Sequence, residues 1–205
     1  MHKTKRGSRF AVTALAAAAA VAAVAVPAAA VPADSGTPRF LEPAELPPHP
    51  SSPWYAGEVT AGQPDPLPMC VGAALPSTAS HRDYRTEYDT SAQQVTVVER
   101  SAQRAEDLTA LLREDLDDCA RKLMEQYPDI TATQKYYGRL NVEEGAHVYG
   151  FHTASTWGSS DINLFSVGRD GRTVTVVRWG QMGNFAHARV ADFKATTVTA
   201  VNKLG

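Results

Sequence analysis

Histidine and serine side chains carry much of protein catalysis, and here their spacing matches no catalytic motif. His147 and His152 are five residues apart on one expected strand. Their side chains therefore point to opposite faces of a sheet and cannot hold one metal ion together. The segment from Trp157 to Asp161 has adjacent serines but lacks the second glycine of a nucleophile elbow and lies between strands. We expect a protein that is not an enzyme and that uses no metal ion or other cofactor.

The segment from Trp179 to Phe185 has the residue types of a ligand-binding loop. It follows an expected strand and combines aromatic residues, two glycines and two amides. An aromatic side chain gives contact area, and orientable amides give hydrogen bonds, which suits an uncharged or weakly polar ligand. The predicted ligand-binding residues are Trp179, Gln181 and Asn184, with Tyr137 or Tyr149 as a neighbour. The alternative is that Trp179 packs beneath the helices and that the loop is only a connection.

The two cysteines, Cys70 and Cys119, bear on stability and on location. An even pair outside the cytoplasm usually forms a disulfide, although two free thiols or an intermolecular link also fit the count. With both thiols bridged, a cysteine nucleophile is not expected. We expect an intramolecular disulfide, which in the chain-entropy model contributes about 4 kcal/mol.

Alternating apolar and polar residues predict the strands that would position these groups. An opening hairpin is expected to turn through Thr90 to Gln93. A later hairpin is expected at Asp170-Gly171, where the turn type favours this dipeptide. Counting outward from it pairs Val167 with Val174, Phe165 with Val176, Leu164 with Val177 and Ile162 with Trp179. The expected strands are 84–89, 94–100, 130–140, 147–153, 162–167 and 173–179.

Two helices are expected beside these strands. Ser101 is a suitable N-cap for a helix that ends near Tyr127, before a proline. Its apolar stripe has three- and four-residue steps and includes Cys119. A second helix is expected within residues 186–204. The order of elements predicts an α+β fold, in which two helices pack on an antiparallel sheet of about five to six strands.

The first 66 residues are expected to lie outside this fold. Residues 1–30 have four basic residues, a long apolar run and a small-residue end, which is the order of a secretory signal peptide. Cleavage is expected after Ala30 or, as the alternative, after Ala33; a membrane anchor is the competing interpretation. Residues 31–66 are rich in proline and are expected to form a tether. Residues 67–205 then form a single domain.

Charge restricts the partners of the mature chain. Without the four basic residues of the signal peptide, 16 basic residues face 22 acidic ones, a formal charge of −6. This surface repels phosphate backbones, so we expect no nucleic acid partner. The sequence has no second long apolar run, so we expect no membrane span after cleavage and a secreted protein.

Residues 67–205 resemble the sensor domain-containing proteins of actinobacteria, which are related to the extracellular sensor domain of PknH-type serine/threonine kinases. The residues that carry the resemblance are Cys70, 85–88, 93–98, the helix from Ala102 to Ala120, and the strand from Val174 to Trp179 with its following Gly180-Gln181. The resemblance implies a disulfide-stabilised domain with a cleft for an unidentified extracellular ligand. We expect no kinase domain and no lipid anchor beside it, and therefore a free-standing secreted relative.

These observations predict a secreted, non-catalytic domain that binds a ligand in the manner of a sensor. Its partner would be an unidentified small molecule or an extracellular protein. The alternative is a protein-interaction or cell-envelope-associated module, which an exposed aromatic patch would favour over a concave pocket. A hydrolase of unfamiliar arrangement would require a nucleophile, a base and an oxyanion donor that converge in space.

Overall fold

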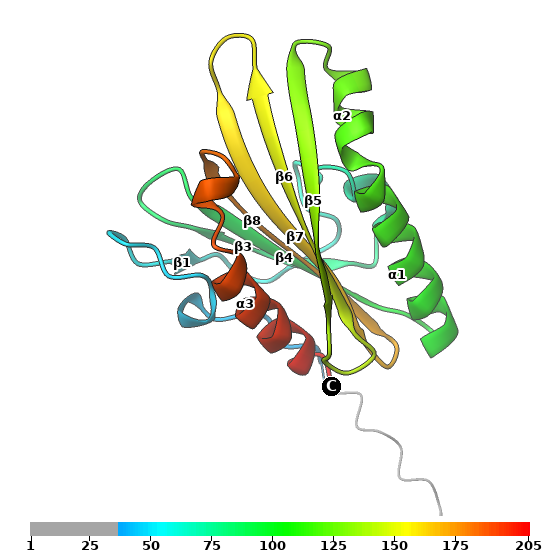
Figure 1. Ribbon diagram of the computed structural model, residues 1–205. Coiled ribbons are helices and arrows are strands. Elements are labelled where there is room, and N and C mark those ends of the chain that lie inside the picture. Colours follow the sequence, from blue (N-terminus) through cyan, green and yellow to red (C-terminus); the bar gives the residue numbers. More distant parts are fainter. Residues whose placement is uncertain (1–36) are drawn as a thin grey trace, which may run out of the picture. The chain divides into compact units, whose positions relative to one another are not determined.

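The computed structural model describes residues 37–205, so the expected signal peptide and its cleavage site lie outside the described part. An eight-stranded antiparallel sheet has the order β1-β3-β4-β8-β7-β6-β5, and β2 also pairs with β3 (Figure 1). The α+β class is confirmed, with more strands and helices than expected.

The strands are β1 (Tyr55–Ala56), β2 (Thr60–Ala61), β3 (Ser80–Arg85), β4 (Ser91–Val98), β5 (Ile130–Leu140), β6 (Ala146–Ser155), β7 (Ser160–Asp170) and β8 (Thr173–Met182). The helices are α1 (Ala102–Asp117), α2 (Cys119–Gln126) and α3 (Val190–Asn202), with three short 3₁₀ helices, η1 (Pro43–Glu45), η2 (Gly72–Ala74) and η3 (Phe185–His187).

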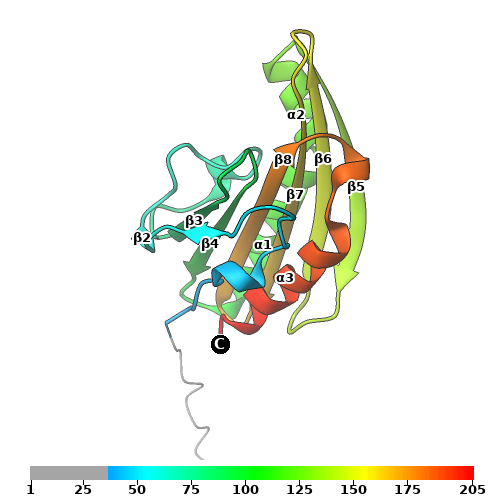
Figure 2. The same ribbon diagram turned by 90° about the vertical axis from the view of Figure 1, so that its left-hand side faces the viewer.

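Each face of the sheet has its own hydrophobic core, because side chains along a strand alternate between the faces. Phe165 and Val176 pack on one face with α1 and α2. Leu164 and Trp179 pack on the other face with Phe193 of α3 and with the segment before β1. Figure 2 shows α3 in front of the sheet and α1 behind it. The two helical layers therefore lie on opposite faces.

The hairpin between β7 and β8 has a different register from the predicted one. The structure pairs Val167 with Val176 instead of Val174, and the other predicted pairs are displaced in the same way. The turn is formed by Gly171 and Arg172, one residue later than expected, and Gly171 has a φ of +52°. Because the displacement is two residues, every side chain remains on its predicted face.

The opening hairpin also begins earlier than predicted. β3 ends at Arg85, and residues 86–90 form the turn, where the Thr86 N–H donates to the Thr90 carbonyl at 3.0 Å. The alternation from Tyr84 to Asp89 therefore continues past the end of the strand. The sequence pattern does not distinguish the strand from the turn, because Thr86 and Thr90 are buried within the turn.

The predicted first helix is divided at Asp118. Ser101 is its N-cap, as expected, and its hydroxyl accepts from the Arg104 N–H. The division has a local cause in the Gln134 side chain on β5. Its amide oxygen accepts from the Ala120 N–H at 3.1 Å and its amide nitrogen donates to the Asp117 carbonyl at 2.7 Å. A side chain that takes over helical backbone hydrogen bonds interrupts the helix.

The predicted disulfide is present. It joins Cys70, in the loop before η2, to Cys119, the first residue of α2, with 5.4 Å between their Cα atoms. Cys119 is fully buried and lies on the apolar stripe of the helix. The bridge therefore ties the segment that enters the sheet to the helical layer.

Residues 37–66, which the sequence assigns to a tether, pack on the domain. Leu41 is fully buried, and Leu46 and Trp54 join the core beneath α3. The Trp54 indole N–H donates to the Pro47 carbonyl at 2.8 Å. Proline keeps a chain extended but does not prevent its apolar side chains from packing, so composition by itself overestimates the tether. Among the described residues, no helix is long and apolar enough to cross a membrane.

Replacement of Cys119 by alanine should lower the free energy of unfolding by about 2–5 kcal/mol, the usual loss for a bridge in a small domain. Urea unfolding of the oxidised protein measures the loss. Reduction of the wild-type protein should give a similar loss, and reduction of Cys119→Ala should add nothing. Equal stability of the wild type and the variant would contradict a stabilising role.

Candidate functional site

The predicted ligand-binding residues do not form one site. Trp179 and Gln181 both line a hollow of about 260 Å³ beneath residues 47–50. However, Trp179 is only 1% exposed and packs in the core on the α3 side. Asn184 is occupied as the N-cap of η3, where its side chain accepts from the Ala186 N–H. The segment is also held by other elements, since the Gly183 N–H donates to the Ser160 carbonyl at 2.7 Å and the Met182 N–H donates to the Asp89 carboxylate at 2.7 Å.

The two tyrosines lie on opposite faces of the sheet. Tyr149 is 1% exposed and packs between Tyr136 and Phe151 on the α1 side, where burial raises the pKa of its hydroxyl. Tyr137 packs with the core on the α3 side. One small ligand cannot contact both Tyr149 and Trp179 through the sheet. Of the two neighbours that the sequence offered, Tyr137 or Tyr149, it is Tyr137 that lies on the same side of the sheet as Trp179.

A larger cleft, which we call the N-terminal cleft, lies on the α3 side of the sheet. Its volume is about 780 Å³, within the range of small-molecule sites. Residues 37–42 form one wall, and β3 and β4 contribute the floor. The sequence does not reveal this cleft, because residues 31–66, which include this wall, have the proline content of a tether. The lining residues are Thr37, Pro38, Arg39, Phe40, Glu42, Val59, Thr78, Ser80, Arg82, Thr96, Val98 and Lys203.

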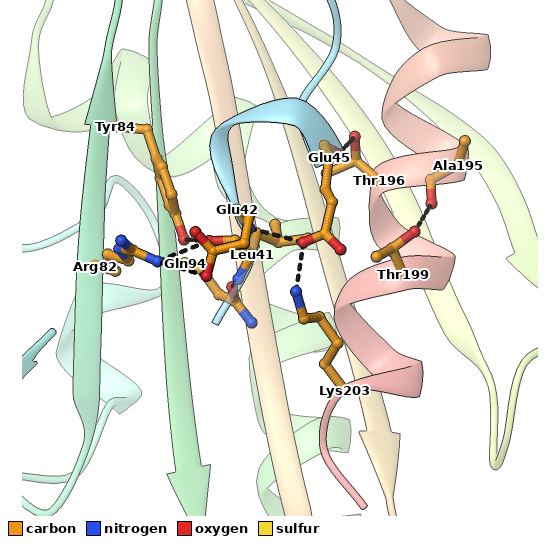
Figure 3. Close-up of polar contacts among 10 residues, drawn as sticks. All are labelled: Leu41, Glu42, Glu45, Arg82, Tyr84, Gln94, Ala195, Thr196, Thr199 and Lys203. Carbon is orange, nitrogen blue, oxygen red and sulfur yellow. Dashed lines mark hydrogen bonds and ion pairs between the residues drawn. The ribbon is translucent and has the colours of Figure 1, made fainter. Parts of the chain in front are cut away.

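The wall is fixed to the sheet at Leu41 (Figure 3). The Leu41 N–H donates to the Gln94 side-chain oxygen at 2.7 Å. The Leu41 carbonyl accepts from the Tyr84 hydroxyl at 2.9 Å and from Arg82 at 3.0 Å. Gln94 is fully buried, and its amide nitrogen reaches Thr175 on β8 at 3.2 Å. Both backbone groups of a buried residue are thus satisfied by side chains, which keeps this extended segment in one position.

The end of α3 closes the cleft through η1. Thr196 on α3 donates to the Glu45 carbonyl at 2.7 Å, and Lys203 forms an ion pair with the Glu45 carboxylate at 2.5 Å (Figure 3). The Arg39 N–H donates to the Lys203 carbonyl at 3.0 Å. Glu42 and Glu45 form a capping box. The wall is therefore attached both to the sheet and to the last helix.

The pKa of Glu45 reflects these contacts. Burial by itself would raise it. The hydrogen bonds from Lys203 and from the Glu42 N–H, with the positive charges of Lys203 and Arg39, outweigh burial and lower the pKa below its ordinary value of 4.5. Glu45 is therefore a carboxylate at neutral pH and holds Lys203 at the end of the cleft.

The floor of the cleft follows from the pairing of β3 with β4. Ser80 pairs with Thr96 and Arg82 pairs with Gln94, which places these four side chains on the same face. Thr96 is 3% exposed, and its hydroxyl has no hydrogen-bond partner among the described residues. Val98, at the end of β4, is 43% exposed. The floor thus offers an apolar surface at Val98, while the Thr96 hydroxyl beside it is buried.

The opposite face has a polar hollow around Arg178. Its guanidinium donates to Asn163 at 3.0 Å, and burial lowers its pKa while the negative charges of Asp161 and Asp83 oppose that shift. This hollow has a volume of about 420 Å³. Its lining has two carboxylates, Asp65 and Asp83, beside this one guanidinium.

The sequence matches no protein-family model and no curated protein. Among solved structures, the chain is similar to the extracellular domain of PknH from Mycobacterium tuberculosis. The TM-score is 0.45 and the sequence identity is 13%, over 73% of this chain and 85% of that chain. A likeness of this extent assigns no ligand and no partner to the present chain.

Replacement of Gln94 by leucine should loosen the wall of the cleft. The variant leaves the buried Leu41 N–H without a partner, at a cost of about 1–3 kcal/mol in unfolding free energy. Hydrogen exchange at the Leu41 amide should accelerate. Gln93→Leu is the matched control, because Gln93 lies on the other face of β4 and bonds only Asp83. Equal effects of the two variants would contradict the role of Gln94.

Glu45 should contribute stability that depends on pH. Its folded-state pKa lies below the unfolded value of 4.5, so the native protein favours the carboxylate. The contribution is therefore full above about pH 4.5 and is lost as the pH falls through the folded pKa. The difference in unfolding free energy between the wild type and Glu45→Gln should shrink as the pH falls below 4.5. Urea titrations at several pH values measure it, and a difference that grows toward low pH would refute the assignment.

Proposed function

We propose that the protein is an exported, non-catalytic domain that binds a small ligand in the N-terminal cleft. The observation that carries this proposal is a cleft of about 780 Å³ whose wall is fixed in place. The hydrogen bonds at Leu41 hold the wall without a ligand. A preformed site loses less entropy on binding than one that must first be ordered.

The composition of the lining also supports binding. Val59 and Val98 are 51% and 43% exposed and lie beside charged groups. Small-molecule sites commonly combine apolar area with a few polar groups that fix orientation. The charged side chains of Arg39 and Arg82 in the lining are such groups. A ligand that covers the valines would remove their apolar surface from water.

Binding without catalysis agrees with the side chains of the cleft. Acyl or phosphoryl transfer by a protein nucleophile needs a hydroxyl or thiol in contact with a base. The hydroxyls that line the cleft belong to threonines and Ser80, and no histidine lines it. Arg82 forms an ion pair with Glu42 at 3.3 Å. These groups are suited to orienting a ligand.

Export is supported by two independent features. The Cys70–Cys119 disulfide is stable in oxidising compartments and is rare in the cytosol. The first 30 residues have the order of a signal peptide. A cleft on an exported domain would meet molecules of the cell surface or the medium.

An interaction module is the second candidate function, favoured by exposed aromatic residues at one end of the sheet. Trp157, in the turn between β6 and β7, is 70% exposed, and Tyr127 at the end of α2 is 50% exposed. The neighbouring Thr156 N–H donates to the Asp129 carbonyl at 3.0 Å, which brings this turn close to the end of α2. Aromatic residues are frequent at the centres of protein interfaces.

A neutral probe tests the proposed function. Decan-1-ol should shift backbone amide resonances of β4 and of residues 37–42 in a saturable manner. Val98→Trp should fill the cleft and remove these shifts, while it keeps the fold because Val98 is 43% exposed. The matched control is Leu111→Trp on α1, on the other face, where leucine is 46% exposed. Shifts that are absent, or that survive Val98→Trp, would exclude the cleft as a binding site.

A further inference from the structure

We propose that the ligand of the N-terminal cleft is an anionic amphiphile, an apolar chain that ends in a carboxylate and binds with that group at Arg39. This inference rests on the proposed function and specifies its ligand class. It follows from the charges at the mouth of the cleft, from the fixed position of Arg39, and from the apolar surface beside it.

The charged side chains of the lining are mostly cationic. Arg39, Arg82 and Lys203 line the cleft, against one carboxylate, Glu42. Arg82 is paired with Glu42, and Lys203 is paired with Glu45. Arg39 makes no ion pair and no side-chain hydrogen bond with any residue in the range 37–205. Among residues 37–205, the Arg39 guanidinium is therefore the cation of the lining without a direct partner, although its charge acts on Glu45.

The backbone holds Arg39 in the lining of the cleft. Its N–H is bonded to the Lys203 carbonyl at 3.0 Å, and Leu41, two residues later, is bonded through both of its backbone groups. Only the side chain of Arg39 must be ordered when a ligand binds. A planar guanidinium can bond both oxygens of a carboxylate at once.

The surface next to Arg39 is apolar. Pro38 and Phe40 flank it in the chain, and Val59 and Val98 present exposed side chains to the same cleft. An anion with a hydrocarbon chain would cover the valines while its head meets the guanidinium. A small inorganic anion would leave them exposed, and an uncharged chain would leave Arg39 without a partner.

The sign of the local charge is opposite to that of the protein. The chain as a whole has a net charge of −2, whereas the pairs Arg82–Glu42 and Lys203–Glu45 leave one cation of the lining, Arg39, unbalanced. A general attraction of anions by the molecule is therefore not expected. A single anionic group fits one unpaired guanidinium, and a polyanion would be repelled by the rest of the surface.

Three probes with the same ten-carbon chain separate charge from apolar contact: decanoate, decan-1-ol and decylammonium. In amide-resonance titrations of the full mature chain, decanoate should bind about fivefold more tightly than decanol. This affinity ratio is the contribution expected from one partly exposed ion pair. Decylammonium should bind most weakly. Added salt should reduce the preference for decanoate, because the mouth is open to solvent.

Arg39→Gln should reduce the decanoate-to-decanol affinity ratio to about one, and Arg39→Lys should retain part of it. Arg104→Gln is the matched control, since this arginine is 64% exposed on the side chain and lies on the α1 side. It should leave the ratio unchanged. Equal binding of decanoate and decanol by the wild type, or equal effects of Arg39→Gln and Arg104→Gln, would overturn the inference but leave the proposed function intact. If no probe shifts the cleft resonances, the proposed function itself fails.

Discussion

The attachment of Leu41 to the sheet is the interaction on which the N-terminal cleft depends. An extended segment of a few residues has no hydrogen bonds of its own, so its position must come from elsewhere. Gln94 supplies an acceptor for the Leu41 N–H, and Tyr84 and Arg82 supply donors for its carbonyl. The buried leucine side chain adds apolar area that is removed from water. Without these contacts the wall would be a free chain, and β3 and β4 would present an open surface.

The same attachment connects three parts of the molecule that are distant in sequence. Gln94 also donates a hydrogen bond to Thr175 on β8, and Glu45 forms an ion pair with Lys203 at the end of α3. The N-terminal segment therefore contacts both the centre of the sheet and the last helix. On the opposite face, the disulfide performs the corresponding role by tying Cys70 to α2. Besides the hydrophobic core on each face, polar contacts attach the chain on one side and a covalent bond attaches it on the other.

The secondary structure was largely predictable, because it depends on local pattern. The limits of β5 and the N-cap at Ser101 agree with the sequence analysis. The predicted limits of the elements are wrong where a residue distant in sequence changes the local hydrogen bonding. For example, the Gln134 side chain, which lies on β5, interrupts the helix at Asp118. The turn at Gly171 shifts the β7–β8 register by two residues without changing the faces.

The sequence by itself determined the class of fold, the favoured disulfide pair and the faces of the residues of β7 and β8, since these follow from alternation, helical periodicity and a count of two cysteines. The site was decided only by the tertiary structure. Trp179 has the chemistry of a ligand-binding residue, yet the sheet buries it. Arg39 lies in a proline-rich stretch that is typical of a tether, yet the bonds at Leu41 place it at a cleft. No local pattern carries this information, because the partners of Leu41 lie 41 to 53 residues away in sequence.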